Sequence, residues 1–194
     1  MPVNIAIFVS GNGTNCENII RHFAAAGSAS RVALVVSNRS DAYAIKRAEA
    51  LGVPVVVMPK ADINDEAKLM GVLNAHNIGF IVLAGFLLMV PDFLVGHYPH
   101  RIVNIHPALL PKYGGKGMYG RHVHEAVCAN RESETGITIH YVSGVCDGGE
   151  ILFQAKTALS PSDTPDDIAA KVHLLEMEHY PRVIEQAIES AFGT

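Results

Sequence analysis

Short apolar runs alternate with helical spacing through the first half of the chain. Runs of about four to eight residues rich in Val, Ile, Leu and Ala, bounded by turn residues, are typical of strands covered on both faces of a parallel sheet. Such runs lie at residues 3–9, 31–36, 53–58, 80–83 and 101–105. Helices are predicted between them, from residue 14 and at residues 42–51 and 66–76. This alternation predicts a doubly wound, mostly parallel sheet.

The second half of the chain shows a different pattern. Residues 135–142 and 150–158 alternate polar with apolar side chains, which indicates antiparallel strands. A short helix is predicted at 122–130 and a long one at 164–192. Pro181 is expected to kink or divide the long helix, because proline has no N–H to donate. The predicted fold class is therefore α/β, with an antiparallel C-terminal extension and a long C-terminal helix.

Composition narrows the class of protein. Hydrophobic residues make up 49% of the 194 residues, which is enough for a sizeable core in a single domain. The net charge of −4 and the lack of a basic block argue against nucleic acid as a partner. The longest apolar run, at 80–90, is too short to span a membrane and contains Gly85, so no membrane partner is expected.

The cysteines and the N-terminal segment bear on the compartment. Cys16, Cys128 and Cys146 are an odd number without the spacing of a metal site. They are therefore expected to be reduced thiols and not part of a disulfide framework. The first residues lack the charged region of a signal peptide. Both features favour a cytoplasmic protein, and the sequence leaves monomer and homodimer open.

A glycine-rich turn follows the first predicted strand and opens the first helix. Residues 11–15 read Gly-Asn-Gly-Thr-Asn. Glycines allow backbone N–H groups to approach an anion, and a helix N-terminus adds free donors and a partial positive charge. Because Cys16 stands where a dinucleotide fingerprint has its third glycine, and no P-loop lysine follows, a phosphate monoester fits better than a dinucleotide. The alternative is a tight turn that binds no ligand.

Two polar side chains mark the end of the predicted strand at 101–105. Asn104 and His106 are two residues apart, so their side chains point to the same side of an extended chain, and Pro107 ends the strand. Ligands of open α/β sheets bind at the carboxyl ends of the strands. An amide donor and an imidazole there suit a reaction that builds negative charge on a carbonyl oxygen and moves protons. The alternative is that His106 is a structural histidine.

Asp147 lies in a loop beside two glycines. Gly148 and Gly149 would let this loop bend so that the carboxylate reaches the same cleft. A carboxylate near His106 favours the charged imidazole and could take part in proton transfer. With Asn104, these residues form a set of acid, base and oxyanion donor, although an Asp-Gly pair by itself most often only makes a turn.

Two further features stay open from the residues alone. His122 and His124 form a His-x-His pair that lines a site, binds a metal or lies at the surface, and no carboxylate or thiol cluster supports the metal. Residues 86–90, Phe-Leu-Leu-Met-Val, are either core or the apolar wall of a pocket for a flat ring.

In this order, these elements resemble the phosphoribosylglycinamide formyltransferase family, a folate-dependent branch of the formyltransferase superfamily. The resemblance covers nearly the whole chain and implies a Rossmann-like fold of the formyltransferase type. The motifs that carry it are residues 10–15, 83–86, 104–111, 135–140 and 147–149. Thr14 and Asn15 in the glycine turn favour this family within the superfamily.

The resemblance implies transfer of a formyl group from 10-formyltetrahydrofolate, as co-substrate, to the amine of glycinamide ribonucleotide in de novo purine biosynthesis, without a metal. Residues 1–100 would be the phosphate-binding half of the domain and 101–194 the catalytic and folate-binding half. The residues expected to bind the ribonucleotide are Gly13, Thr14, Asn15, Pro107, His173 and Glu176. The residues expected to bind folate are Leu87, Leu88, Met89, Val90, Val142, Ser143, Gly144, Val145 and Cys146.

The expected chemistry uses Asn104, His106 and Asp147. The amine attacks the formyl carbon and forms a tetrahedral oxyanion, which the Asn104 N–H and a protonated His106 would stabilise. Asp147 would keep His106 cationic and, directly or through a water, carry the proton from the amine to the leaving nitrogen. No covalent enzyme adduct is needed, so Cys146 has no chemical role.

Three features depart from the family pattern. Leu88 and Asp65 stand where the family often has arginines, which implies a loss of contacts to the folate tail. The loop at 114–121 is longer than in the compact form of the family.

Two rival functions remain: a hydrolase of the same superfamily, which would use water in place of the amine, and a non-catalytic domain that binds a nucleotide phosphate.

Overall fold

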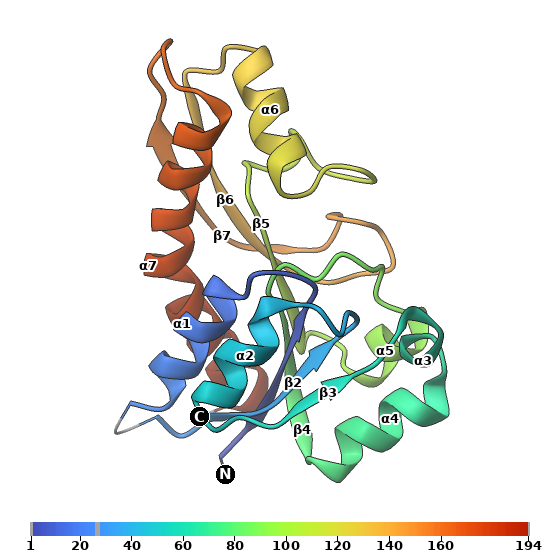
Figure 1. Ribbon diagram of the computed structural model, residues 1–194. Coiled ribbons are helices and arrows are strands. Elements are labelled where there is room, and N and C mark those ends of the chain that lie inside the picture. Colours follow the sequence, from blue (N-terminus) through green and yellow to red (C-terminus); the bar gives the residue numbers. More distant parts are fainter. Residues whose placement is uncertain (1, 26–27, 194) are drawn as a thin grey trace.

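The computed structural model describes residues 2–25 and 28–193. Within these residues, seven strands form one sheet in the order β3-β2-β1-β4-β5-β6-β7 (Figure 1). The first five strands are parallel, and β6 and β7 extend the sheet antiparallel at one edge. The bounds are Asn4–Val9 (β1), Arg31–Ser37 (β2), Val55–Val57 (β3), Ile78–Leu83 (β4), Ile102–His106 (β5), Glu134–Tyr141 (β6) and Ile151–Ala158 (β7). The predicted fold class is confirmed.

Two strands start two residues away from their predicted bounds, and the other strands agree with theirs to within one residue at each end. β3 is three residues long, because Pro54 has no N–H for the ladder and β3 pairs on one side only, with β2. β4 begins at Ile78, two residues before the predicted start. Gly79 follows Ile78, and glycine is a weak strand former, so the apolar pattern becomes visible only at residue 80.

Helices join the strands and cover both faces of the sheet. Their bounds are Thr14–Phe23 (α1), Tyr43–Ala50 (α2), Lys60–Ile63 (α3), Glu66–Ala75 (α4), Asp92–His97 (α5), Arg121–Ala129 (α6) and Pro165–Phe192 (α7). The sequence pattern does not predict α3 and α5, which are too short to show a helical period. Among the described residues, no helix combines the length and the apolar character needed to cross a membrane.

A separate hydrophobic core lies on each face of the sheet. Ile5, Ile7 and Val9 of β1 pack in the core formed with α1, α2, α6 and α7. Ala6 and Phe8 of the same strand pack in the opposite core, with α3, α4 and α5. Successive side chains of a strand point to opposite faces, so a strand covered on both faces must be apolar throughout. The wholly apolar runs in the sequence have this cause.

The C-terminal helix α7 is continuous past Pro181. Proline cannot donate to the carbonyl of Met177 one turn earlier, but Nδ2 of Asn18 on α1 donates to that carbonyl at 2.8 Å. A capping box of Thr164 and Asp167 begins the helix. The prediction was that Pro181 kinks or divides the helix; the division is contradicted, because a neighbouring helix supplies the missing donor.

The carboxyl ends of β1, β4 and β5 lie side by side, and the segments that follow these strands position the candidate site. The N–H of Ser10 after β1 donates to the carbonyl of Gly85 after β4 at 3.1 Å. The Ser10 hydroxyl accepts from the N–H of Leu87 at 2.9 Å and donates to Oδ1 of Asn38 at 2.6 Å. These bonds join the turn after β1 to the segment after β4, at the place where ligands of open α/β sheets bind.

Candidate active site

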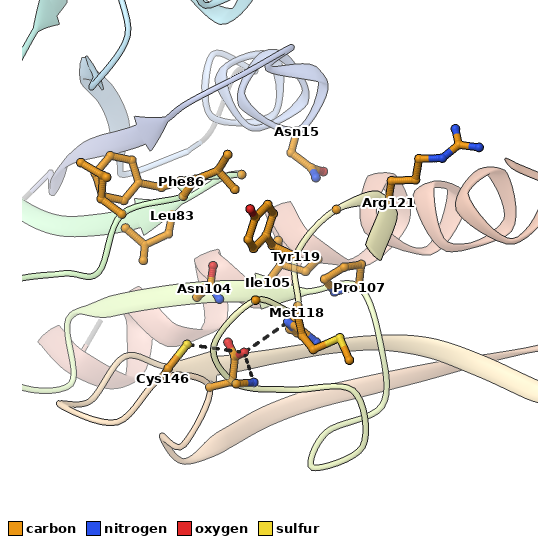
Figure 2. A pocket seen from close by; sticks show the side chains of 18 of the residues that line it. Asn15, Leu83, Phe86, Asn104, Ile105, Pro107, Met118, Tyr119, Arg121 and Cys146 are labelled. Atoms are coloured by element: carbon orange, nitrogen blue, oxygen red, sulfur yellow. Dashed lines mark hydrogen bonds and ion pairs between the residues drawn. The ribbon is translucent and has the colours of Figure 1, made fainter. Parts of the chain in front are cut away.

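A large cavity lies at the carboxyl ends of these strands. Its volume is about 1180 Å³, compared with roughly 300–1,000 Å³ for pockets that hold one small ligand. It is lined by all the predicted site residues except Gly13 and Gly144, together with the loop at 115–121. Figure 2 shows Asn15 from α1 and Asn104 from β5 on its wall. One space therefore offers room for two ligands.

Asn104, His106 and Asp147 all reach this cavity. The first two come from β5, and Asp147 comes from the loop after β6. Oδ2 of Asp147 lies 3.6 Å from Nδ1 of His106, and both side chains are buried. The φ of Asp147 is 53°, a left-handed conformation that aspartate adopts more readily than most residues, and it turns the loop back toward the sheet. The structure thus brings the three side chains together, while their roles stay a prediction.

His140 is a member of this cluster that the sequence analysis missed. Its Nε2 lies 3.6 Å from Oδ1 of Asp147 and 3.2 Å from Nδ2 of Asn104. Its Nδ1 donates to the carbonyl of Tyr141 at 2.9 Å, so Nε2 is the ring atom that faces both the Asn104 amide and the Asp147 carboxylate. His140 and Asn104 are directly paired across β5 and β6, a register that the sequence pattern does not reveal. His140 thus holds the amide in one orientation.

Asp147 is held in its anionic form. Burial acts to raise its pKa, but contact with His140, a hydrogen bond of 2.9 Å from the N–H of Gly115 and the charge of His106 outweigh burial and lower the pKa below its ordinary value. A carboxylate with this surrounding stays ionised at neutral pH and is a fixed negative charge beside the imidazole.

His106 is held in its neutral form. Burial lowers its pKa below the ordinary value, and the attraction of Asp147 and the hydrogen bond to the Tyr113 carbonyl offset this only in part. The expectation that Asp147 keeps His106 cationic is therefore wrong: the carboxylate acts in the expected direction, but burial is the larger effect. Nε2 of His106 donates to the Tyr113 carbonyl at 2.7 Å, so the neutral ring carries its free lone pair on Nδ1.

The glycine-rich turn presents the start of α1 to the cavity. Gly13 is the N-cap with φ 79°, and a Cβ at this position would overlap Ala44 of α2. The turn is held in place because the N–H of Ala44 donates to the Gly11 carbonyl at 3.0 Å. Gly13 has no side chain with which to cap the first N–H groups of the helix. Thr14 and Asn15 therefore line the cavity beside free backbone donors, as an anion site requires.

Asn15 connects this turn to α7. Its Nδ2 donates to Oε2 of Glu176 at 3.0 Å, and Nδ1 of His173 lies 3.3 Å from the same oxygen. The hydrogen bond with Glu176 raises the pKa of His173. Oδ1 of Asn15 and Nδ1 of His124 are buried and have no hydrogen-bond partner among the described residues. This end of the cavity therefore has polar groups with unused hydrogen-bonding capacity.

Comparison with known proteins identifies the family. Residues 3–184 match the family described as formyl transferase. The chain belongs to the formyl transferase family. A relative named phosphoribosylglycinamide formyltransferase from Escherichia coli (strain K12) is 35% identical over 94% of this chain and 85% of its own length. A chloroplastic protein of the same name from Arabidopsis thaliana is 38% identical over 95% of this chain, which spans 66% of that protein.

Solved structures of formyl transferases agree in fold. The crystal structure of phosphoribosylglycinamide formyltransferase from Anaplasma phagocytophilum superimposes with a TM-score of 0.87 at 27% identity, covering 97% of this chain and 89% of that one. The protein of the same name from Streptococcus pneumoniae TIGR4 gives a TM-score of 0.84 at 33% identity, covering 96% of this chain and 99% of that one.

One mouth of the cavity is apolar. Leu87, Met89 and Val145 are large hydrophobic side chains with exposed fractions of 51%, 58% and 68%. Leu88, between the first two, is partly buried against the core that contains Phe8. Exposed apolar side chains gathered around a cavity are typical of a surface that binds a flat apolar group. This mouth is the place predicted for folate.

Polar residues whose role the sequence left open have local contacts in the structure. Asp65 is the N-cap of α4 and accepts from the N–H of Lys68 at 3.1 Å. His122 is exposed and lies 3.7 Å from Glu125, whereas His124 is buried and lines the cavity. Within residues 2–25 and 28–193, no group of three His, Cys, Asp or Glu side chains is arranged to hold a metal ion.

The long loop before α6 also contributes to the cavity wall. Met118 and Tyr119 from this loop and Arg121 at the start of α6 are drawn around the cavity in Figure 2. The sequence pattern does not indicate that these side chains belong to a site, because the glycine-rich residues around them show no periodic pattern.

Proposed function

We propose that this chain transfers the formyl group of 10-formyltetrahydrofolate to the primary amine of glycinamide ribonucleotide, a step of de novo purine biosynthesis. The observation that carries the proposal is a single cavity, in a member of the formyl transferase family, that joins a free helix N-terminus to Asn104, His106 and Asp147. The names of the relatives support the same activity.

The ribonucleotide is placed by its charge. Its phosphate binds at Gly13, Thr14 and Asn15, where the backbone donors and the dipole of α1 favour an anion. Its ribose hydroxyls hydrogen-bond to Glu176, which Asn15 and His173 hold in place. The glycinamide arm then extends past Pro107 toward His106. The amine, the strongest nucleophile of this substrate, reaches the buried imidazole.

The folate binds at the apolar mouth. Its pterin ring lies between residues 87–90 and residues 142–146, where exposed apolar side chains and loop backbone face the same space. This arrangement sets the formyl group between the pterin and His106. With Leu88 partly buried and Asp65 engaged in capping α4, neither residue replaces an arginine contact to the glutamate tail.

The chemistry follows from a neutral His106. The amine nitrogen forms a bond to the formyl carbon, and the formyl oxygen becomes an oxyanion that a free N–H of Asn104 stabilises, an interaction commonly worth about 3 kcal/mol. Nδ1 of His106 accepts the amine proton, and Asp147 stabilises the imidazolium that forms. The imidazolium then returns the proton to the leaving folate nitrogen as its bond to carbon breaks. No covalent adduct with the protein forms.

The test is consumption of the formyl donor with and without the amine substrate. We expect loss of 10-formyltetrahydrofolate only when glycinamide ribonucleotide is present, with formyl-glycinamide ribonucleotide as product. Loss of the donor with release of formate in the absence of the amine would contradict transfer and mark a hydrolase. No consumption under either condition would mark a domain that only binds ligands.

A further inference from the structure

The segment after β5 contacts both ionisable groups of the site through its backbone. The carbonyl of Tyr113 accepts a hydrogen bond of 2.7 Å from Nε2 of His106. Two residues later, the N–H of Gly115 donates one of 2.9 Å to Oδ2 of Asp147. A short stretch of main chain therefore supplies an acceptor to the imidazole and a donor to the carboxylate.

Tyr113 has an unfavourable backbone conformation. Its φ is 56°, in the left-handed region, where a residue with a bulky side chain is uncommon and costs free energy. Such a conformation persists only where surrounding contacts hold it. The direction of the Tyr113 carbonyl depends on this conformation, so the contacts that hold Tyr113 also hold the acceptor of His106.

Those contacts lie at the far end of the Tyr113 side chain. Its hydroxyl donates to Oε1 of Glu132 at 2.8 Å and accepts from Nδ2 of Asn130 at 2.8 Å. Nζ of Lys112 also donates to Oε1 of Glu132, at 3.1 Å. Asn130 and Glu132 follow α6, away from the residues that line the cavity. We call Tyr113, Asn130 and Glu132 the tyrosine clamp.

We propose that the tyrosine clamp holds the Tyr113 carbonyl on His106 and thereby fixes the imidazole as the tautomer that accepts a proton at Nδ1. This inference deepens the proposed formyl transfer and rests on it. A carbonyl only accepts, so Nε2 keeps its proton and Nδ1 presents its lone pair beside Asp147. Once the amine proton has moved to Nδ1, the carbonyl and Asp147 contact the two N–H groups of the imidazolium. Tyr113 is a positioning residue that acts through His106.

The ionisable groups that face His106 determine the sign of the expected effect. They are Asp147 from the loop after β6, His140 from β6 and His124 from α6. Burial has the largest influence and lowers the pKa of His106. Asp147 and the Tyr113 carbonyl raise this pKa, and His140 lowers it. Loss of the carbonyl contact therefore lowers the pKa of His106 further while Asp147 and His140 stay in place.

The experiment removes the clamp from the side opposite the cavity. In Tyr113→Phe and in Glu132→Ala, we expect kcat to fall about tenfold, the size of effect that a misplaced catalytic group produces. The KM of both substrates should stay within about twofold of the wild type, because no ligand contact is lost. The acidic limb of the kcat profile should move to lower pH, because a base of lower pKa is protonated only at lower pH.

Matched variants separate positioning from a general loss of structure. Glu132→Gln keeps an acceptor for the Tyr113 hydroxyl and should retain close to wild-type kcat. Glu134→Ala removes a nearby exposed carboxylate that pairs with Lys156 at 2.9 Å, and its profile should match the wild type. The double variant Tyr113→Phe with Glu132→Ala should lose no more than either single variant, because both remove the same contact.

A wild-type profile in Tyr113→Phe would overturn the inference. So would lower activity that comes with raised KM values and lower thermal stability but an unshifted profile, since that result marks Tyr113 as structural. NMR titration of His106 in the free protein gives a readout that does not need turnover: its pKa should be lower in Tyr113→Phe. If the wild type shows no amine-dependent consumption, the proposed function fails, and the titration still decides whether the clamp acts on His106.

Discussion

At the scale of single residues, burial and charge give the two ionisable partners of the site different states. Burial acts against the charged form of both, yet Asp147 has enough donors around it to stay anionic, while His106 has a single carboxylate and a carbonyl and stays neutral. Two titratable groups with such environments are typical of an acid–base pair in which one group moves the proton and the other stabilises the charge. This difference supports the proposal that His106 acts as the base and Asp147 as its fixed counter-charge.

Replacing His106 by alanine tests this assignment. We expect His106→Ala to lower kcat by at least about a hundredfold, because positioned general bases commonly contribute roughly 10²–10⁴. Steady-state kinetics at saturating substrates measure the effect, and circular dichroism checks that the fold is intact. His97→Ala is a suitable control, because His97 is exposed, does not line the cavity and lies 2.9 Å from Oε1 of Glu66 through its Nε2. Near-normal turnover in His106→Ala would reject its catalytic role.

Replacing Asp147 by asparagine tests the counter-charge. The carboxylate raises the pKa of His106, so its removal leaves only the Tyr113 carbonyl to oppose burial and lowers that pKa further. Activity that needs the neutral base is lost as pH falls through its pKa, so in Asp147→Asn the acidic limb of the kcat profile should move to lower pH, with a lower plateau. Measurement of kcat from about pH 5 to 9 shows both effects. A profile that keeps its wild-type midpoint would contradict the coupling.

At the scale of elements, the proposed anion site depends on close packing of the first two helices. The turn before α1 is held against α2 by the bond from the Ala44 N–H to the Gly11 carbonyl, and Arg47 of α2 donates to the Asn12 carbonyl at 2.9 Å. Gly13 has a positive φ and no room for a Cβ. The free N–H groups of α1 face the cavity because α2 fixes this geometry.

Gly13→Ala should therefore damage substrate binding and stability together. A residue with a Cβ is strained at this φ and must displace Ala44, which costs about 1–3 kcal/mol of unfolding free energy. We expect the KM for glycinamide ribonucleotide to rise at least about tenfold while that for the formyl donor changes little. Gly71→Ala in α4 is the control, because a Cβ there meets open space and helix propensity favours alanine. Equal changes in both KM values would contradict the assignment of this turn to the phosphate.

The elements also show what the sequence could and could not predict. Strand ends and alternation placed Asn104 and His106 on one side of β5, because that geometry is local. His140 was missed because its pairing with Asn104 depends on the register of β6. That α7 is not divided at Pro181 has a similar cause, since the donor that replaces the lost hydrogen bond comes from Asn18, 159 positions from the Met177 carbonyl that accepts it. The Tyr113 carbonyl has no sequence signature, because it acts through a backbone conformation.

At the scale of the whole molecule, the site is assembled from both halves of the chain. Asn15 and Glu176 are 161 positions apart and share a hydrogen bond of 3.0 Å, and His106 lies in the strand that joins the parallel part of the sheet to its antiparallel edge. A ligand that contacts α1, β5 and α7 at once binds only the fully folded chain. The fold class, and the meeting of these elements at one site, were predicted from the sequence. The shape of the loop at 114–121 was not predicted, because its residues show no periodic pattern.

Ligand-linked stability tests this assembly. A ligand that binds only the folded state at about a hundred times its Kd adds about 2.7 kcal/mol to the unfolding free energy, which raises the Tm of a chain of this size by roughly 5–10 °C. We expect glycinamide ribonucleotide to produce such a rise in thermal scans, and glycinamide, which lacks the ribose and the phosphate, to produce none. Glu176→Ala should lessen the rise, because the ribose contact from α7 is lost. Equal shifts with both compounds would show that the helix N-terminus and α7 do not hold the substrate, and that the cavity binds it by another part of its wall.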